Sequence, residues 1–132
     1  MELGLVGLGK MGNNMRERMR RAGLTVIGYD RNPEVSDTAS LAELVSKLTG
    51  PRVVWVMLPI QVVGPVIEEL KGLLSAGDLV IDGGNSKWSN DGPHAQSLAE
   101  KGIRFVDVGV SGGVWGLQNG YALMVGGDDA DV

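Results

Sequence analysis

Six residues near the amino terminus have the types and spacing of a loop that binds phosphate groups. Three glycines follow the pattern GxGxxG, directly after an apolar run and directly before a run with helical spacing. The first glycine would allow a tight turn, the second would let a diphosphate approach the backbone, and the third would let the helix pack closely on a sheet. Free N–H groups and the positive end of that helix would hold the diphosphate. The pattern predicts a dinucleotide-binding loop formed by Gly7, Leu8, Gly9, Lys10, Met11 and Gly12.

An acidic residue follows at the distance that such a loop requires. Asp30 comes directly after the second apolar run, roughly 20 residues beyond the glycines. Its carboxylate would accept hydrogen bonds from the ribose hydroxyls of adenosine and would repel a 2′-phosphate. We therefore expect NAD as the cofactor, with NADP as a weaker alternative. The adjacent Arg31 could pair with a phosphate or stack on adenine.

Three further loops follow apolar runs and carry residues suited to ligand contacts. Leu58 and Pro59 would face the cofactor, although Pro59 is nearly as typical of a helix start. Asn85, after two glycines that let the backbone approach a ligand, offers both a donor and an acceptor, although turns often use the same residues. Ser111 and the N–H groups after it could hold a carboxylate or hydroxyl, and a structural hairpin fits that segment equally well.

Alternating apolar and amphipathic runs would place these loops at one edge of a sheet. The pattern predicts an α/β fold with a doubly wound, mostly parallel, Rossmann-like sheet, in which Asn85 and Ser111 face one crevice beside Leu58 and Pro59. A capping box at Ser40 is expected to start the second helix, and Gly64-Pro65 is expected to delay the third. Strands are expected at Glu2–Val6, Thr25–Tyr29, Val53–Leu58, Leu79–Asp82 and Arg104–Val108, and helices at Lys10–Ala22, Ser40–Leu48, Val62–Leu74 and Ser89–Lys101.

Composition excludes several classes of function. The 132 residues include no cysteine and a single histidine, His94, which we expect at the surface. Thiolate chemistry, a Ser-His-Asp triad and a metal site are therefore not expected. A net charge of −4 argues against nucleic acid as a partner. The longest apolar run, Val53–Ile60, is far shorter than a membrane helix, and the amino terminus lacks a secretory signal, so we expect a cytoplasmic protein with no membrane partner.

Several segments together resemble the 6-phosphogluconate dehydrogenases, most closely the shorter, NAD-preferring bacterial type. They are GLGKMG, YDRNP, VMLP, IDGGNS and DVGVSGGVWGLQNGYALMVGG, which together span almost the whole chain. The resemblance implies oxidative decarboxylation of 6-phosphogluconate to ribulose 5-phosphate, with a hydride passed from the C3 hydroxyl to the nicotinamide. It implies that the glycine loop holds the pyrophosphate, that Asp30 and Arg31 hold the adenosine ribose, and that Leu58 and Pro59 line the cofactor pocket. It implies that Asn85 touches both nicotinamide and substrate, and that the substrate contacts are Asn85, Ser111, Gly112 and Gly113.

The resemblance also implies what this chain lacks. The family's lysine base and glutamate acid lie beyond its last residue, so no catalytic residue is expected and the chain alone should be inactive. Its acidic end, residues 126–132, resembles the first turn of a helix, with a frayed tail as the alternative. We therefore expect residues 1–132 to be the NAD-binding domain of a longer, homo-oligomeric protein. The stretch Pro33–Ser40 is shorter than in most relatives, so a helix and a small edge strand are expected to be missing.

Two other interpretations remain open. A 3-hydroxyacid dehydrogenase of the hydroxyisobutyrate type shares the glycine loop and an SGG segment. A regulatory NAD-sensing domain without catalysis would need no second ligand loop. The DGGNS and VSGGVWG segments favour the 6-phosphogluconate dehydrogenase interpretation over both.

Overall fold

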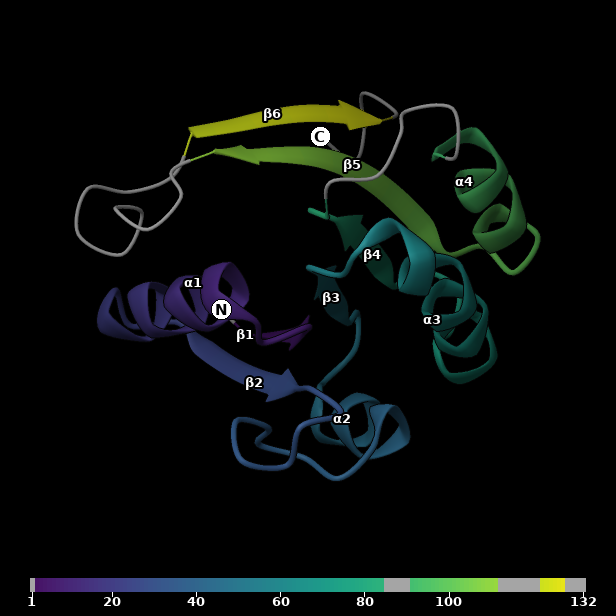
Figure 1. Ribbon diagram of the computed structural model, residues 1–132. Coiled ribbons are helices and arrows are strands. Elements are labelled where there is room, and N and C mark those ends of the chain that lie inside the picture. Colours follow the sequence, from purple (N-terminus) through teal and green to yellow (C-terminus); the bar gives the residue numbers. More distant parts are fainter. Residues whose placement is uncertain (1, 85–90, 112–121, 128–132) are drawn as a thin grey trace.

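The computed structural model describes residues 2–84, 91–111 and 122–127, which form one sheet with helices on both faces (Figure 1). Strands and helices alternate from the amino terminus to β5, as the apolar and amphipathic runs predicted. The strands are β1 (Glu2–Val6), β2 (Thr25–Tyr29), β3 (Val53–Val56), β4 (Leu79–Asp82), β5 (Arg104–Ser111) and β6 (Ala122–Gly127). The helices are α1 (Lys10–Arg21), α2 (Leu41–Lys47), α3 (Ile60–Leu73) and α4 (Asp91–Ala99).

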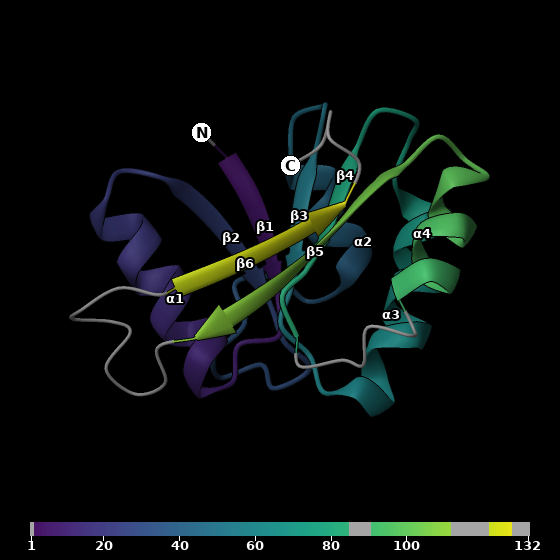
Figure 2. The same cartoon turned by 90° about the horizontal axis from the view of Figure 1, so that it is seen from above.

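The strand order confirms the doubly wound sheet. It is β2-β1-β3-β4-β5-β6, and all neighbouring strands are parallel except β6, which runs antiparallel to β5. The chain moves outward from β1 to β2 and then returns to the other side of β1 for β3. Such a reversal leaves a crevice at the carboxyl ends of the two central strands, which is where open α/β sheets bind ligands. The β5–β6 pair extends beyond the shorter strands as a long ribbon (Figure 2).

Two hydrophobic cores hold the helices to the sheet, one on each face. In β1, Leu3 and Leu5 pack with Met19 of α1, whereas Val6 belongs to the core under α2, α3 and α4. That larger core also contains Ile67 of α3, which is fully buried. Successive strand residues thus serve opposite faces, which explains why the strands are apolar without a polar alternation.

The predicted capping box of α2 is confirmed. The Ser40 hydroxyl accepts from the Glu43 N–H at 3.1 Å, and the Glu43 carboxylate accepts from the Ala39 N–H at 2.7 Å. The Glu43 N–H is one of those that the helix itself leaves free, and the reciprocal bond holds Ala39, the residue before the N-cap.

The predicted start of α3 was wrong. The helix begins at Ile60, with Pro59 as its N-cap in an extended conformation, and Pro65 lies inside it. Pro65 is exposed and removes a single N–H from the helical ladder, so the Gly64-Pro65 pair does not delay the helix. Other boundaries moved by a few residues: α1 ends one residue early, β3 ends at Val56, α4 ends at Ala99, and β5 continues to Ser111.

The connector 33–40 completes the outer edge of the sheet. It leads from β2 to α2 without a helix or strand of its own, as its shortness predicted. Asp37 bonds both backbone groups of Gly28: its carboxylate accepts from the Gly28 N–H at 2.7 Å, and its own N–H donates to the Gly28 carbonyl at 3.0 Å. The same carboxylate accepts from Arg16 and Arg20 of α1 at 3.2 and 2.7 Å. The connector therefore covers an edge that would otherwise present unpaired backbone groups.

Within the described ranges, no helix combines the length and the apolar character needed to cross a membrane.

Candidate functional site

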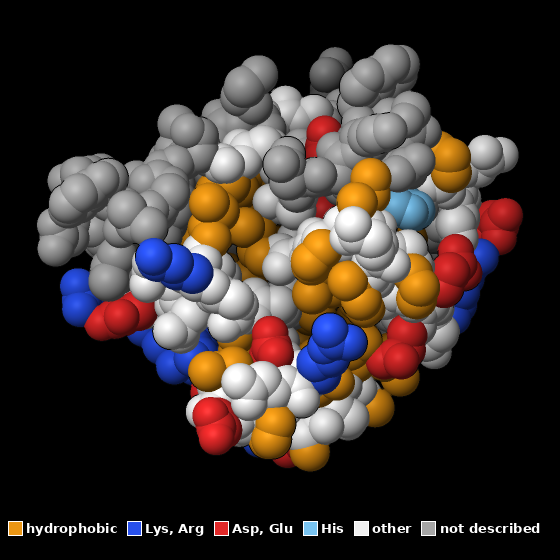
Figure 3. Space-filling view, viewed as in Figure 1, with side chains coloured by type: hydrophobic (Ala, Val, Ile, Leu, Met, Phe, Trp, Pro, Cys, Tyr) orange, Lys and Arg blue, Asp and Glu red, His pale blue; other side chains and the backbone are white. Residues whose placement is uncertain are grey.

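A cavity of about 380 Å³ lies at the crevice formed by the strand reversal. It opens where β1, β2 and β3 end and where α3 begins. On the corresponding face of the molecule, hydrophobic side chains gather over α3 with charged side chains around them (Figure 3). The cavity is lined by Val6, Gly7, Gly9, Tyr29, Asp30, Arg31, Leu41, Met57, Leu58, Pro59, Val62, Val66 and Glu69.

The three glycines of the loop have three different surroundings. Gly7 has a φ of 94°, and a Cβ there would lie 2.2 Å from the Met57 carbonyl oxygen. A Cβ on Gly12 would lie 2.0 Å from the Gly7 carbonyl oxygen, so only glycine lets α1 approach the loop this closely. A Cβ on Gly9 would meet no atom within 4 Å. Packing therefore requires glycine at 7 and 12, whereas at 9 its absent side chain leaves space open at the cavity.

The first turn of α1 is open to an anion. Gly9 is its N-cap and offers no side-chain acceptor, and no acidic residue stands in the first turn. No side chain of the first turn itself therefore occupies its free N–H groups or opposes the positive pole of the helix. Gly7 and Gly9 line the cavity, whereas the other four predicted loop residues, Leu8, Lys10, Met11 and Gly12, are not among its lining residues.

Asp30 lines the cavity and holds the glycine loop in place. One carboxylate oxygen accepts from the Leu8 N–H at 2.7 Å, and the other accepts from the Asn32 N–H at 2.8 Å. A carboxylate has about four lone-pair positions, so both oxygens retain capacity for hydroxyl donors. The bond to the loop is a role that the sequence did not reveal.

Arg31, Leu58 and Pro59 line the same cavity, as predicted. Arg31 is exposed, and within the described part of the chain its side chain makes no hydrogen bond or ion pair. It is therefore available to a ligand.

Sequence reasoning missed the wall that α3 contributes. Val62, Val66 and Glu69 are spaced at i, i+4 and i+7, so they form one stripe along the helix. Tyr29 and Leu41 complete this part of the lining. The helical spacing was a usable signal, but starting α3 at Val62 hid how the stripe continues from Pro59.

The two glycines after β4 contact protein rather than open space. A Cβ on Gly83 would lie 2.3 Å from the Trp55 indole nitrogen, and one on Gly84 would lie 2.5 Å from the Leu58 carbonyl oxygen. Packing within the protein is therefore enough to require glycine at both positions, and the approach of this backbone to a ligand stays a prediction. They do bring the end of β4 against the cavity wall at Leu58.

The predicted substrate contacts are only partly visible. Asn85, Gly112 and Gly113 lie outside the described residues. Ser111 ends β5, four residues beyond Asp107, which is the register partner of Asp82 at the end of β4. This places the Ser111 backbone about 13 Å past the β4 end along the strand direction. Convergence of Asn85 and Ser111 stays a prediction.

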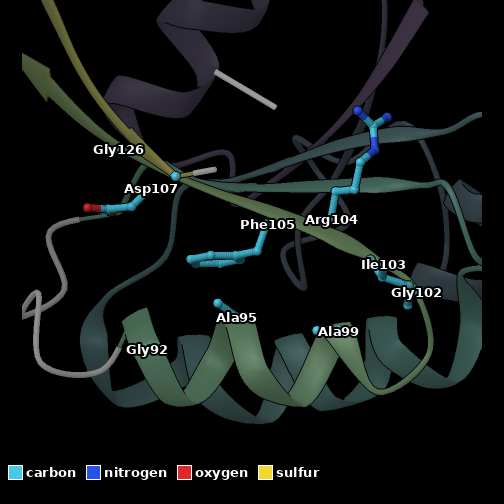
Figure 4. Close-up of a pocket in the computed structure, with 10 residues that line it drawn as sticks. Gly92, Ala95, Ala99, Gly102, Ile103, Arg104, Phe105, Asp107 and Gly126 are labelled. Carbon is cyan, nitrogen blue, oxygen red and sulfur yellow. The ribbon is translucent and has the colours of Figure 1, made fainter. Parts of the chain in front are cut away.

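A second cavity, of about 500 Å³, lies between α4 and the β5–β6 ribbon. Ala95 and Ala99 of α4 face Phe105 of β5 across it (Figure 4). None of the predicted site residues that the structure describes lines this cavity. Nearby, His94 is half-buried, with its ring edge-on to Phe105 at 6.4 Å between centroids, so the prediction of an ordinary surface histidine was wrong.

Comparison with known proteins agrees with this geometry. Residues 2–132 match the family model described as the NAD binding domain of 6-phosphogluconate dehydrogenase. YqeC of Bacillus subtilis, provisionally named a 6-phosphogluconate dehydrogenase, is 39% identical over 97% of this chain and 46% of its own length. The decarboxylating 6-phosphogluconate dehydrogenase of Haemophilus ducreyi is 38% identical over 97% of this chain and 30% of its own length.

Solved structures give the same relationship. The 6-phosphogluconate dehydrogenase of Plasmodium falciparum superposes with a TM-score of 0.90 at 28% identity, over 98% of this chain and 31% of that one. The 3-hydroxyisobutyrate dehydrogenase of Mycobacterium tuberculosis superposes with a TM-score of 0.86 at 26% identity, over 98% of this chain and 47% of that one. The chain thus spans less than half the length of these relatives, and it belongs to the family of NAD-binding domains of 6-phosphogluconate dehydrogenase.

Proposed function

We propose that this chain binds NAD in preference to NADP and forms the cofactor domain of an NAD-dependent 6-phosphogluconate dehydrogenase. The glycine loop and the first turn of α1 would hold the diphosphate. Asp30 would accept hydrogen bonds from the adenosine ribose, Arg31 would lie against the adenine, and Leu58 and Pro59 would line the pocket. Asn85 would contact both nicotinamide and substrate, with Ser111, Gly112 and Gly113 as further substrate contacts.

The open space at Gly9 is the observation that carries this proposal. Both other glycines of the loop are required by contacts within the protein, but Gly9 touches nothing on its side-chain side and lines the cavity. If Gly9 served only to shape the turn, the open volume beside its Cα would have no purpose. A diphosphate that meets backbone N–H groups there would need it.

The position of Asp30 supports NAD over NADP. Its carboxylate lines the cavity beside the glycine loop, where the adenosine ribose would lie. A 2′-phosphate at that ribose would place negative charges together, and Arg31 is the one cation among the described lining residues that could offset them. The Plasmodium relative is described with NADP⁺, so the preference for NAD that we propose would distinguish this chain from that enzyme.

The reaction that we propose for the longer protein is oxidative decarboxylation. The bound dinucleotide would accept the hydride from C3 of 6-phosphogluconate, and the β-keto acid so formed loses CO₂ as electrons flow into the new carbonyl. The lysine base and glutamate acid that the family uses match no position here. Residues 1–132 would therefore bind and orient the cofactor without turning over substrate.

A 3-hydroxyacid dehydrogenase domain is the second candidate, because the hydroxyisobutyrate enzyme has almost the same backbone over this chain. The experiment is to supply a longer protein containing this chain with NAD and with either 6-phosphogluconate or 3-hydroxyisobutyrate. NADH formation from 6-phosphogluconate alone is the expected result. Turnover of neither substrate, with NAD still bound, would favour an NAD-sensing domain instead.

Binding itself is tested by substituting Gly9. Calorimetry should show that Gly9→Ala weakens NAD binding at least tenfold, because the added methyl group would stand where the diphosphate meets the backbone. Thermal unfolding should shift by only a few degrees, the scale of a weaker N-cap, because the methyl group would meet no atom of the described residues within 4 Å apart from its chain neighbours, and the φ of −65° suits alanine.

Gly72→Ala is the matched control for Gly9→Ala. Gly72 also has no atom within 4 Å of its Cβ position, but it lies near the end of α3 and does not line the cavity. NAD affinity should be unchanged in this variant. Equal NAD affinities for the wild-type chain and Gly9→Ala would contradict the proposed diphosphate site.

A further inference from the structure

We propose that Glu69 recognises the base of the dinucleotide, by accepting a hydrogen bond from the 6-amino group of adenine. The inference rests on the proposed function and adds a specificity-determining residue to the same cavity. Glu69 lies on α3, apart from both the glycine loop and the Asp30 segment.

The cavity is lined by polar groups in one part and by apolar side chains in another. Gly7, Gly9 and Asp30 line its polar part, at the ends of β1 and β2. Further lining comes from Tyr29, Leu41, Val62 and Val66, which together form an apolar slot. In a dinucleotide the base follows the ribose, so a ribose at Asp30 would direct the base into this slot. Apolar and aromatic walls suit the faces of a purine, and its edge then needs polar partners.

Glu69 stands at the far part of that slot. It follows Val62 by seven residues, two turns of helix, which corresponds to about 10 Å along α3. Because Val62, Val66 and Glu69 share one stripe, the carboxylate continues the wall that the two valines form. Among the lining residues that the structure describes, it is the only acidic side chain besides Asp30.

The Glu69 carboxylate has no bonding partner within the described part of the chain. It makes no hydrogen bond or ion pair there, whereas its neighbour Glu68 accepts from the Ser97 hydroxyl of α4 at 2.7 Å. Lys71, on the same helix, donates to the carboxylate of Glu100, the residue directly after α4, at 2.7 Å. The α3 residues that face α4 are thus paired, and the one carboxylate that faces the cavity is unpaired.

A carboxylate at the purine edge would discriminate among bases. An ionised carboxylate only accepts hydrogen bonds. It would be satisfied by the 6-amino group of adenine, but it would repel the 6-oxo group of hypoxanthine. Selectivity of this kind comes from an unfavourable pairing with the wrong ligand as much as from a favourable one with the right ligand.

The test compares two dinucleotides on three forms of the chain. Calorimetry would give dissociation constants for NAD and for nicotinamide hypoxanthine dinucleotide, which differ only at the purine 6-position and the adjacent ring nitrogen. The wild-type chain should bind NAD about tenfold more tightly. In Glu69→Gln the preference should fall to about twofold or less, because an amide can also donate to a 6-oxo group.

Glu68→Gln is the matched control, because it removes the same charge one residue away on the side that faces α4. It should retain the tenfold preference. Equal binding of both dinucleotides by the wild-type chain, or a preference unchanged in Glu69→Gln, would overturn this inference alone. If the wild-type chain bound neither dinucleotide, the proposed function would fail and this inference with it.

Discussion

Both carboxylate oxygens of Asp30 accept backbone hydrogen bonds, so this side chain shapes the cavity as well as lining it. Its bond to the Leu8 N–H joins the glycine loop to the end of β2. The same carboxylate supplies the negative charge that we expect to exclude a 2′-phosphate. These two roles can be separated, because an amide in place of the carboxylate keeps an acceptor but loses the charge.

Asp30→Asn should shift cofactor preference toward NADP. The asparagine oxygen can still accept from one of the two N–H groups, while repulsion of the 2′-phosphate disappears and Arg31 remains. The preference for NAD, expressed as the difference between the binding free energies of NAD and NADP, should shrink by about 1–3 kcal/mol. That is the scale of one charge-assisted contact. Calorimetry with both cofactors measures it. An unchanged preference would mean that the ribose is not held at Asp30.

At the scale of single residues, the sequence could predict only those roles that depend on the spacing of residues along the chain. The roles of Gly7 and Gly12 follow from their places in the loop. The need for glycine at 83 could not be predicted, because it depends on Trp55 of a neighbouring strand lying across it. Glu69 was hidden for a similar reason: its importance depends on which face of α3 meets the end of β2.

At the scale of elements, the connector between β2 and α2 shows how a short segment replaces regular structure. Asp37 bonds both backbone groups of Gly28 and pairs with two arginines of α1, so one side chain joins the sheet edge to a helix. Burial raises the pKa of Asp37, but the Gly28 N–H and the guanidinium groups of Arg16 and Arg20 outweigh it, and the pKa lies below its usual 3.8.

Asp37→Asn should destabilise the chain by about 1 kcal/mol at pH 7, a modest value because the side chain is one-third exposed and its ion pairs are screened by solvent. Because the folded pKa is lowered, the charged carboxylate stabilises the fold above pH 3.8, and this contribution is lost as the pH falls through the lower folded value. Urea unfolding at pH 7 and at about pH 3 measures both parts. An equal loss at both pH values would show that charge is not the cause.

Most element positions could be predicted because they depend on local patterns. The apolar runs gave the first four strands, and the Ser40–Glu43 pair gave the start of α2. The start of α3 could not be predicted, because Gly64-Pro65 is a common helix boundary and only packing shows that the helix continues through it. The three extra residues of β5 were missed because β6, their pairing partner, lies well beyond them in the sequence.

At the scale of the whole molecule, the two ends of the sheet have separate roles. The cavity lies at the carboxyl ends of the strands, whereas an ion pair between Arg52 and Asp78 lies at the amino ends of β3 and β4, with 3.2 Å between the charged atoms. Asp78 is buried and also accepts from the N–H groups of Arg52 and Ser75 at 2.7 and 2.8 Å. Burial alone would raise its pKa, but these donors and the Arg52 guanidinium lower it below 3.8.

Asp78→Asn should lower the free energy of unfolding by about 2–4 kcal/mol at pH 7 and leave NAD affinity unchanged, because the Arg52 guanidinium and two N–H groups lose a buried, charged acceptor. The stabilisation by Asp78 is present above pH 3.8 and is lost as the pH falls through the lowered folded pKa, so the variant and wild type should converge in acid. Urea unfolding and calorimetry measure the two effects.

Glu34→Gln is the control for Asp78→Asn, because Glu34 is exposed and its side chain has no partner among the residues described. It should change neither stability nor binding measurably. A loss of NAD affinity in Asp78→Asn, at conditions where the variant is fully folded, would show that the two ends of the sheet are coupled.

The link between the Leu8 N–H and Asp30 also bears on how fast a ligand can bind. The glycine loop is already bonded to the end of β2, so it does not need to become ordered after the dinucleotide has formed an encounter complex. Association should then be a single kinetic step with no slow ordering phase. Substitutions around the cavity should therefore change mainly the dissociation rate constant of the cofactor, while its association rate constant stays nearly the same.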